Sequence, residues 1–72
     1  MRVTFDPKAD AAYIYLREIE RGGAKHTCAV ECDEATGMIV LDIDDEGRLI
    51  GIEVIGARDG LPPQVLAEAR GH

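Results

Sequence analysis

The sequence contains no serine, no asparagine and no tryptophan, and it has only one phenylalanine and two tyrosines. Without serine, the chain has no nucleophile for serine-dependent acyl transfer. A phosphate-binding loop is also missing, because the Gly22-Gly23 pair is not followed by the Lys and the Ser or Thr that such a loop requires. We therefore expect neither a serine hydrolase nor a P-loop nucleotide-binding protein.

The scarcity of large side chains also limits the core that this chain can form. Its 72 residues suffice for one domain, which we expect to span residues 1–72. A domain of this size buries only about 60% of its unfolded surface. Small cores without a disulfide or a metal often gain stability by associating with another chain. The sequence therefore predicts a homodimer or another homo-oligomer.

Basic residues are few and scattered along the chain. Eight of them stand against fourteen acidic residues, which gives a formal net charge of −6 at pH 7. Proteins that bind nucleic acids usually neutralise phosphates with clustered Lys and Arg, so we expect no direct binding to DNA or RNA. A basic protein partner fits the charge better, and solubility alone is the simpler function of an acidic surface.

Long apolar runs and disulfide pairs are absent as well. No stretch reaches transmembrane length, and the opening Met-Arg-Val-Thr-Phe-Asp lacks the apolar segment of a signal peptide. Cys28 and Cys32 are four residues apart in a predicted strand, which separates them by about 13 Å, whereas a disulfide needs Cα atoms within roughly 7 Å. We expect two buried structural cysteines, no membrane contact and a cytoplasmic location.

Apolar and polar residues alternate along most of the chain, which predicts antiparallel strands. We expect an α+β fold, with an antiparallel β-meander of four to five strands and one short C-terminal helix. The helix should start near Pro62-Pro63 and end near Gly71, and its apolar stripe is Val65, Leu66 and Ala69. Strands are expected from Met1 to Asp6, around Ala12 to Leu16, from Lys25 to Cys32, and on both sides of a turn at Asp44 to Gly47.

The aliphatic residues set the register of the first hairpin. With Pro7 to Asp10 as the loop, Phe5 pairs with Ala12 and Val3 pairs with Ile14, so the aliphatic pairs share one face. A slip of one residue would mix the two faces. The opposite face then carries the pairs Thr4–Tyr13 and Arg2–Tyr15.

The last hairpin also gathers aliphatic side chains on one face, namely Ile39, Leu41, Ile43, Ile50, Ile52 and Val54. Its other face is mixed and holds Met38, Val40, Leu49 and Ile55 beside Asp42 and Glu53. We expect the C-terminal helix or another subunit to cover part of this mixed face. A carboxylate among aliphatic residues needs a partner, so Glu53 should meet an Arg or a backbone amide.

The acidic turn resembles a calcium loop but is predicted to be a hairpin. Asp42, Asp44, Gly47 and Glu53 follow the calcium-loop pattern, and Glu46 departs from it at the third ligand position. Such a loop needs flanking helices, whereas the flanks here are β-branched and alternating. Glu53 would then lie down the strand, out of reach of a cation held at the tip.

Histidine and cysteine also offer metal ligands, without completing a site. His26 and Cys28 could share a zinc ion, but Cys32 is too far along the strand and His72 lies at the terminus. We predict no metal site, no cofactor and no catalytic residue.

The tyrosine pair is the most promising binding feature. Tyr13 and Tyr15 share a strand face near Arg2 and Arg17, and Tyr and Arg are enriched in protein interfaces. Either a partner or the C-terminal helix should cover them. The predicted partner surface consists of Tyr13, Tyr15, Arg17, Asp42, Asp44 and Glu53.

Two segments carry a family resemblance. F-D-P-K-A-D-A-A-Y-I-Y-L (Phe5 to Leu16) and V-L-D-I-D-D-E-G-R-L-I-G-I-E-V-I-G-A (Val40 to Ala57) are similar to the small bacterial domain-of-unknown-function family numbered 2283. Its members typically show an aromatic-Asp-Pro-x-x-Asp-Ala-x-Tyr opening and an Asp-x-Asp-x-x-Gly-x-x-x-Gly-Ile-Glu centre. The matching residues are Asp6, Pro7, Asp10, Tyr13, Asp42, Asp44, Gly47, Gly51 and Glu53.

The resemblance implies no established activity. Some members are encoded next to toxin-like proteins, which implies an antitoxin-like role. Together with the charge, this predicts a non-enzymatic interaction module that binds a basic protein partner. The alternatives are a metal-binding protein or metal-dependent enzyme that uses Asp42, Asp44 and Glu53, and a purely structural homodimer.

Overall fold

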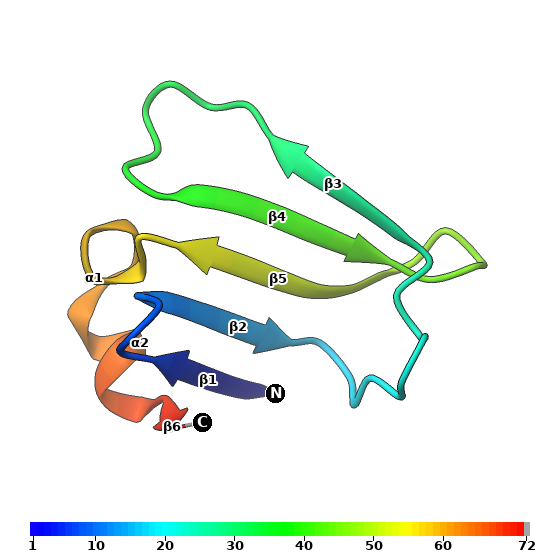
Figure 1. Ribbon diagram of the computed structural model, residues 1–72, viewed down its shortest axis with the longest axis horizontal. Helices are drawn as coiled ribbons and strands as arrows, with labels where there is room; N and C mark the ends of the chain where they lie inside the picture. Colours follow the sequence, from blue (N-terminus) through cyan, green and yellow to red (C-terminus); the bar gives the residue numbers. More distant parts are fainter. Residues whose placement is uncertain (72) are drawn as a thin grey trace.

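The computed structural model describes residues 1–71 and contains one open sheet with two short helices at one end (Figure 1). The elements are β1 (Arg2–Asp6), β2 (Ala11–Tyr15), β3 (His26–Val30), β4 (Met38–Ile43), β5 (Leu49–Ile55), α1 (Ala57–Gly60), α2 (Pro63–Glu68) and β6 (Arg70–Gly71). The strand order is β3-β4-β5-β2-β1-β6. Five strands are antiparallel and the two-residue β6 runs parallel to β1, which confirms the predicted α+β fold.

The sheet combines two locally formed units. β1 and β2 form a hairpin, and β3, β4 and β5 form a meander. The segment between β2 and β3 passes the ends of β5 and β4, so that β5 returns to pair with β2 (Figure 1). The pairing of β2 with β5 therefore brings together residues about 40 positions apart in sequence. It also places the two segments that resemble the family, Phe5 to Leu16 and Val40 to Ala57, side by side in the sheet.

The predicted register of the first hairpin is confirmed. Val3 pairs with Ile14 and Phe5 pairs with Ala12, while the pairs Thr4–Tyr13 and Arg2–Tyr15 lie on the opposite face. In the last hairpin, Ile39 pairs with Val54 and Leu41 pairs with Ile52, as the aliphatic pattern requires. A register shift follows Asp42, so that Ile43 pairs with Leu49 at the base of the turn.

The sheet has an aliphatic face and a tyrosine face, because alternate residues of each strand point to opposite sides. Two rows of side chains cross the aliphatic face from β1 to β3: Val3, Ile14, Ile52, Leu41 and Cys28, and then Phe5, Ala12, Val54, Ile39 and Val30. The tyrosine face has the intervening rows: Arg2, Tyr15, Gly51, Asp42 and Thr27, and then Thr4, Tyr13, Glu53, Val40 and Ala29.

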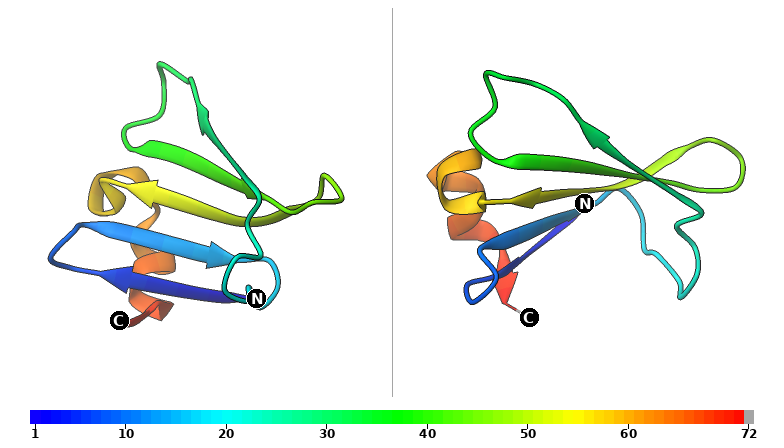
Figure 2. Two further views of the ribbon diagram at one scale, coloured as in Figure 1. Left: turned by 45° about the vertical axis from the view of Figure 1, so that its right-hand side comes forward. Right: turned by 45° about the horizontal axis from the view of Figure 1, so that its top comes forward.

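The helices cover only one end of the aliphatic face. The hydrophobic core there consists of Ala12, Val54 and Ala57, with Phe5, Ile52, Leu61 and Leu66 packed against it. Figure 2 shows both helices at the end of the sheet, with α2 beside β1 and β2 and the β3 side left uncovered. Either the C-terminal helix or another chain was expected to cover the mixed face and the two tyrosines. The helix does not, because it packs on the opposite face.

The C-terminal region also differs from the single helix expected. α2 begins at Pro63 as predicted but ends at Glu68, and Arg70–Gly71 then pairs with β1 as β6. The additional turn α1 follows β5 directly and buries Ala57 completely. Asp10 explains this turn, because its carbonyl oxygen accepts hydrogen bonds from the backbone N–H groups of Gly56 and Ala57 at 2.8 and 3.0 Å. Sequence periodicity contains no signal for such a long-range contact.

The prediction of buried structural cysteines is wrong. Cys28 and Cys32 are both free and exposed, and all five residues of β3 are exposed. β3 is an edge strand, and no helix lies over it in the described part of the chain (Figure 2). β3 ends at Val30, so Cys32 lies beyond the strand.

Neither described helix has the length and apolar character needed to cross a membrane.

Candidate functional site

The tyrosine face holds a polar network at its centre. The Tyr13 hydroxyl donates a 2.5 Å hydrogen bond to Oδ2 of Asp42, and the Thr27 hydroxyl donates one of 2.9 Å to Oδ1. The three residues come from β2, β4 and β3, so the network joins strands on both sides of β5. Both oxygens of Asp42 are thereby used within the sheet, which leaves this carboxylate poorly suited to binding a cation at the hairpin tip.

Gly51 makes this network possible. It lies in β5 between Tyr15 and Asp42 in the register, and the Tyr13 ring leans over it. A Cβ at this position would lie 2.6 Å from Cε1 of Tyr13, which is closer than non-bonded carbons approach. Glycine is therefore required because a side chain would fill the space that the tyrosine ring occupies.

Tyr15 is covered by an arginine rather than by a helix. The Arg2 guanidinium lies 3.8 Å above the centre of the Tyr15 ring, and the two tyrosine rings are 4.6 Å apart. Arg2 also donates two hydrogen bonds to the Glu18 carboxylate, at 3.0 and 3.1 Å. This arrangement combines a cation–π contact with a bidentate ion pair, which fixes the ring of Tyr15 against its neighbour.

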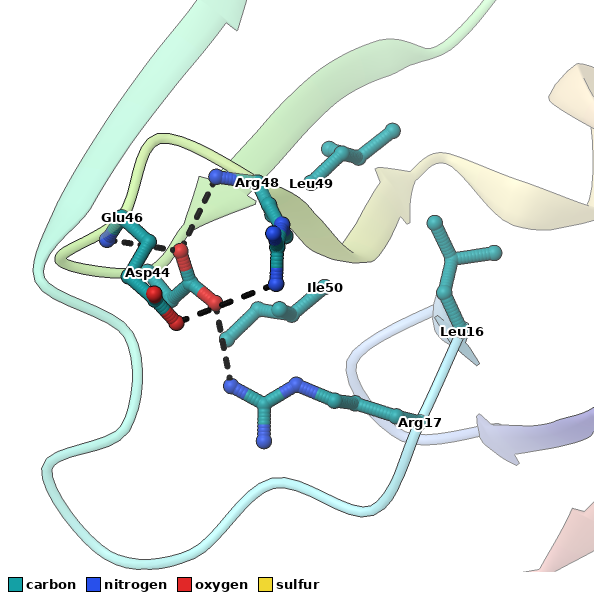
Figure 3. Close-up of a pocket in the computed structure, with 7 residues that line it drawn as sticks. All are labelled: Leu16, Arg17, Asp44, Glu46, Arg48, Leu49 and Ile50. Carbon is teal, nitrogen blue, oxygen red and sulfur yellow. Dashed lines mark hydrogen bonds and ion pairs between the residues drawn. The ribbon is translucent and has the colours of Figure 1, made fainter.

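Arg17 and Asp44 lie elsewhere, at the base of the last turn (Figure 3). Oδ1 of Asp44 accepts hydrogen bonds from the backbone N–H groups of Glu46 and Arg48, both at 2.9 Å. Oδ2 accepts one from Arg17 at 3.3 Å. The bonds from the Arg48 and Glu46 backbone and from Arg17 hold the pKa of Asp44 below its usual value, against the opposing effect of its burial. Asp44 is thus a turn-forming residue, as the hairpin prediction implied.

Glu53 differs from Tyr13, Asp42 and Thr27 on the tyrosine face, because its side chain has no hydrogen-bond partner within residues 1–71. It is half-buried and stands between Tyr13 and Val40 in the register. Glu53 lines a depression together with Tyr13, Tyr15, Asp6 and three alanines from the β1–β2 turn and the start of β2. Within residues 1–71 it forms no hydrogen bond or ion pair with any other side chain or backbone group, so the partner predicted for it is not found there. The carboxylate is left free to bind an external donor.

The structure therefore brings together four of the six predicted site residues. Tyr13, Tyr15, Asp42 and Glu53 share one face, whereas Arg17 and Asp44 form a separate pair. Sequence reasoning missed Thr27 as a partner of Asp42, and it missed the space that Gly51 provides for Tyr13. Thr27 meets Asp42 through the β3–β4 pairing, whereas Gly51 meets the Tyr13 ring through the long-range β2–β5 pairing.

No group of three or more His, Cys, Asp or Glu side chains lies close enough to hold a metal ion among the residues that the structure describes. His72, considered above as a fourth zinc ligand, lies outside those residues. His26 and Cys28 are two positions apart on exposed β3, and Cys32 lies beyond the strand.

The Tyr13 hydroxyl is expected to ionise only far into the alkaline range. Burial, the hydrogen bond to Asp42 and the nearby negative charges together raise its pKa well above the ordinary value of 10.0. Since the folded pKa lies above the unfolded one, this contribution to stability is complete below pH 10 and is lost as the pH rises further. The tyrosinate absorbance of the wild type minus that of Tyr13→Phe should show no transition near pH 10. A difference titration centred at pH 10 would contradict the buried hydrogen bond.

Comparison with known proteins gives one match. A family model described as a protein of unknown function, DUF2283, matches residues 2–58. The match covers all five antiparallel strands and reaches into α1, and it ends before α2 and β6. No curated protein and no solved structure matches the chain.

Proposed function

Because the chain belongs to DUF2283, a family of proteins of unknown function, we propose a role from its geometry: a non-enzymatic interaction module that binds a basic protein through the tyrosine face. The main support for this proposal is that the Glu53 carboxylate has no partner within residues 1–71. Most of the other residues that match the family motifs have visible structural contacts. Asp6, Asp10 and Asp44 accept backbone hydrogen bonds, Tyr13 and Asp42 bind each other over Gly51, and Gly47 has a positive φ.

The surroundings of Glu53 favour a cationic side chain as its ligand. The half-buried Glu53 carboxylate remains accessible to water, and a charged N–H donor from a partner can replace that water. The depression beside Glu53 is lined by both tyrosines, and the Tyr13 ring can pack against the stem of a Lys or Arg side chain from a partner. Tyrosine-rich surfaces of this kind are typical of protein interfaces.

The charge of the whole chain supports the same partner chemistry. A net charge of −6 attracts a basic protein at long range and repels an acidic one. An antitoxin-like role is one form of this proposal, in which the partner is a basic, RNA-binding toxin and the acidic module masks its surface. The proposal itself requires only a basic partner with an exposed Lys or Arg.

Glu53→Gln is expected to weaken partner binding by about 10- to 100-fold, because it removes one desolvated charge pair. The test begins with affinity capture from the host, using tagged wild type, Glu53→Gln and Glu20→Gln. The captured partner is then purified and titrated against each variant by calorimetry. Glu20→Gln removes the same charge from an exposed loop position and should bind like the wild type.

Two results would argue against this function. One is the absence of any stoichiometric basic partner with the wild type. The other is a partner that binds Glu53→Gln and the wild type equally well, which would place the interface away from the tyrosine face.

A further inference from the structure

The aliphatic face is only partly covered by the chain itself. Leu61 and Leu66 pack at the end where Ala12 and Val54 are buried. The neighbouring row, which we call the open row, is only partly covered: Val3, Ile14, Ile52 and Leu41 are half-buried, and Cys28 is exposed. Met1 and Leu16, at the β1–β2 end of this row, are exposed as well. A groove lined by Met1, Val3, Ile14, Val65 and Glu68 continues the open row towards α2.

The exposed area of the chain shows how much surface is left uncovered. Its solvent-accessible surface is 5176 Å² at a mass of 7.8 kDa. A folded monomer of that mass exposes about 4,400 Å², so this chain exposes roughly 800 Å² more. A standard protein interface buries about 800 Å² on each partner. This excess, summed over the whole molecule, is similar in size to the area that one stable interface would remove from water.

The buried core leads to the same conclusion. Its apolar members are Ala12, Ile50, Val54 and Ala57, and Ile50 is the one large side chain that is fully buried within the described residues. Two of the four are alanines, which contribute little apolar area. Because so small a core gives little stability, an additional apolar contact with another chain would stabilise the fold.

We propose that a second copy of this chain covers the open row, forming a two-fold homodimer in which two aliphatic faces pack against each other. The two face rows carry no charged side chain, so two copies can meet there despite their net charge of −6 each. The row has no charged side chain that would select a different partner, and a two-fold axis would bring the same surface of two copies together. A second copy is also present wherever the chain is made.

This dimer differs from the interaction proposed above, because it uses the opposite face of the sheet. Two sheets packed face to face lie about 10 Å apart with interdigitated side chains. Both tyrosine faces then point outwards, so a dimer would present two copies of the Glu53 site. Glu53→Gln should leave the dimer unchanged, which separates a failure of one proposal from a failure of the other.

Neighbouring residues of β3 provide a matched pair of variants. Cys28 and Ala29 are both exposed, and their side chains point to the aliphatic and the tyrosine face respectively. Cys28→Glu places a charge in the proposed interface and should raise the dimer dissociation constant by about 100-fold or more. Ala29→Glu should change it by less than about 3-fold. Light scattering during size-exclusion chromatography, over a range of concentrations, measures both.

A second measurement needs no substitution. In the dimer, the Cys28 thiol lies in the interface, whereas Cys32 lies beyond the end of β3 and stays accessible. Labelling of the wild type with a maleimide, followed by peptide mass spectrometry, should show protection of Cys28 that disappears on dilution, with Cys32 reacting at a constant rate. This result also supports the proposal if Cys28→Glu fails to fold.

Three outcomes would overturn the proposal. The first is a wild type that is monomeric at all concentrations, with Cys28 as reactive as Cys32. The second is a dimer that Cys28→Glu leaves intact. The third is equal loss of the dimer in Cys28→Glu and Ala29→Glu, which would indicate pairing through the β3 edge instead of the face.

Discussion

Gly51→Ala is expected to lower the free energy of unfolding by about 3 kcal/mol, a large fraction of the stability of a domain of this size. The added methyl group would lie 2.6 Å from Cε1 of Tyr13, so the ring must move. When it moves, the hydroxyl loses its hydrogen bond to Asp42, and the half-buried carboxylate loses a donor. Urea unfolding followed by circular dichroism measures the change.

A second background tests the cause of this effect. In Tyr13→Ala the ring is absent, and Gly51→Ala should then be neutral or slightly stabilising, because Ala loses less backbone entropy than Gly in a strand. The sign of the Gly51→Ala effect would thus depend on the residue at position 13. If Gly51→Ala destabilised both backgrounds equally, the Tyr13 ring would not be what requires glycine at position 51. The described packing of Tyr13 over Gly51 would then be contradicted.

Asp10→Ala is expected to destabilise the fold by about 2 kcal/mol, through two separate effects. Asp10 has a φ of 51°, a left-handed conformation that Asp tolerates better than Ala. Its side chain also accepts a 3.0 Å hydrogen bond from the backbone N–H of Arg58, which anchors the first turn of α1. Loss of this contact loosens the turn that buries Ala57 against the sheet.

A series at this position separates the two contributions. Asp10→Asn keeps both the hydrogen bond and the tolerance of positive φ, so it should be within about 0.5 kcal/mol of the wild type. Asp10→Gly keeps only the backbone conformation and should fall between Asn and Ala. The ion pair of Asp10 with Arg58 is exposed and 3.6 Å long, so its loss in Asp10→Asn contributes little. An Asn variant as unstable as the Ala variant would show that charge, and not geometry, holds the turn.

Both predictions concern residues of the family motifs, and together they explain why those motifs contain glycine and aspartate. Asp10 lies at the end of the β1–β2 turn and anchors a helix 48 residues further along the chain. Gly51 leaves space for a ring from a neighbouring strand. These residues stabilise the fold, whereas Glu53 has no contact of this kind in the described structure. This difference makes Glu53 the most informative position for function.

The candidate site was only partly predictable from the sequence. The alternation in β2 placed Tyr13 beside Tyr15, and the alternation in β4 and β5 placed Asp42 and Glu53 on one face of their hairpin. The two pairs share a surface only because β5 pairs with β2. Arg17 follows Tyr15 closely in sequence, yet it lies beyond the end of β2 and binds Asp44 instead. A strand pattern predicts neighbours on a face only as far as the strand extends.

The sequence by itself determined the local structure: the two hairpins, their registers and the turn at Asp44, because period-two alternation and turn residues act between neighbours in the chain. Only the tertiary structure decided which hairpin lies beside which, where the helices pack, and that Cys28 is exposed on an edge strand. Those outcomes depend on contacts between residues far apart in sequence, such as Tyr13 with Asp42 and Asp10 with Arg58, which no local pattern specifies. The open aliphatic row has the same origin, since only the position of the helices shows which apolar residues the chain leaves uncovered.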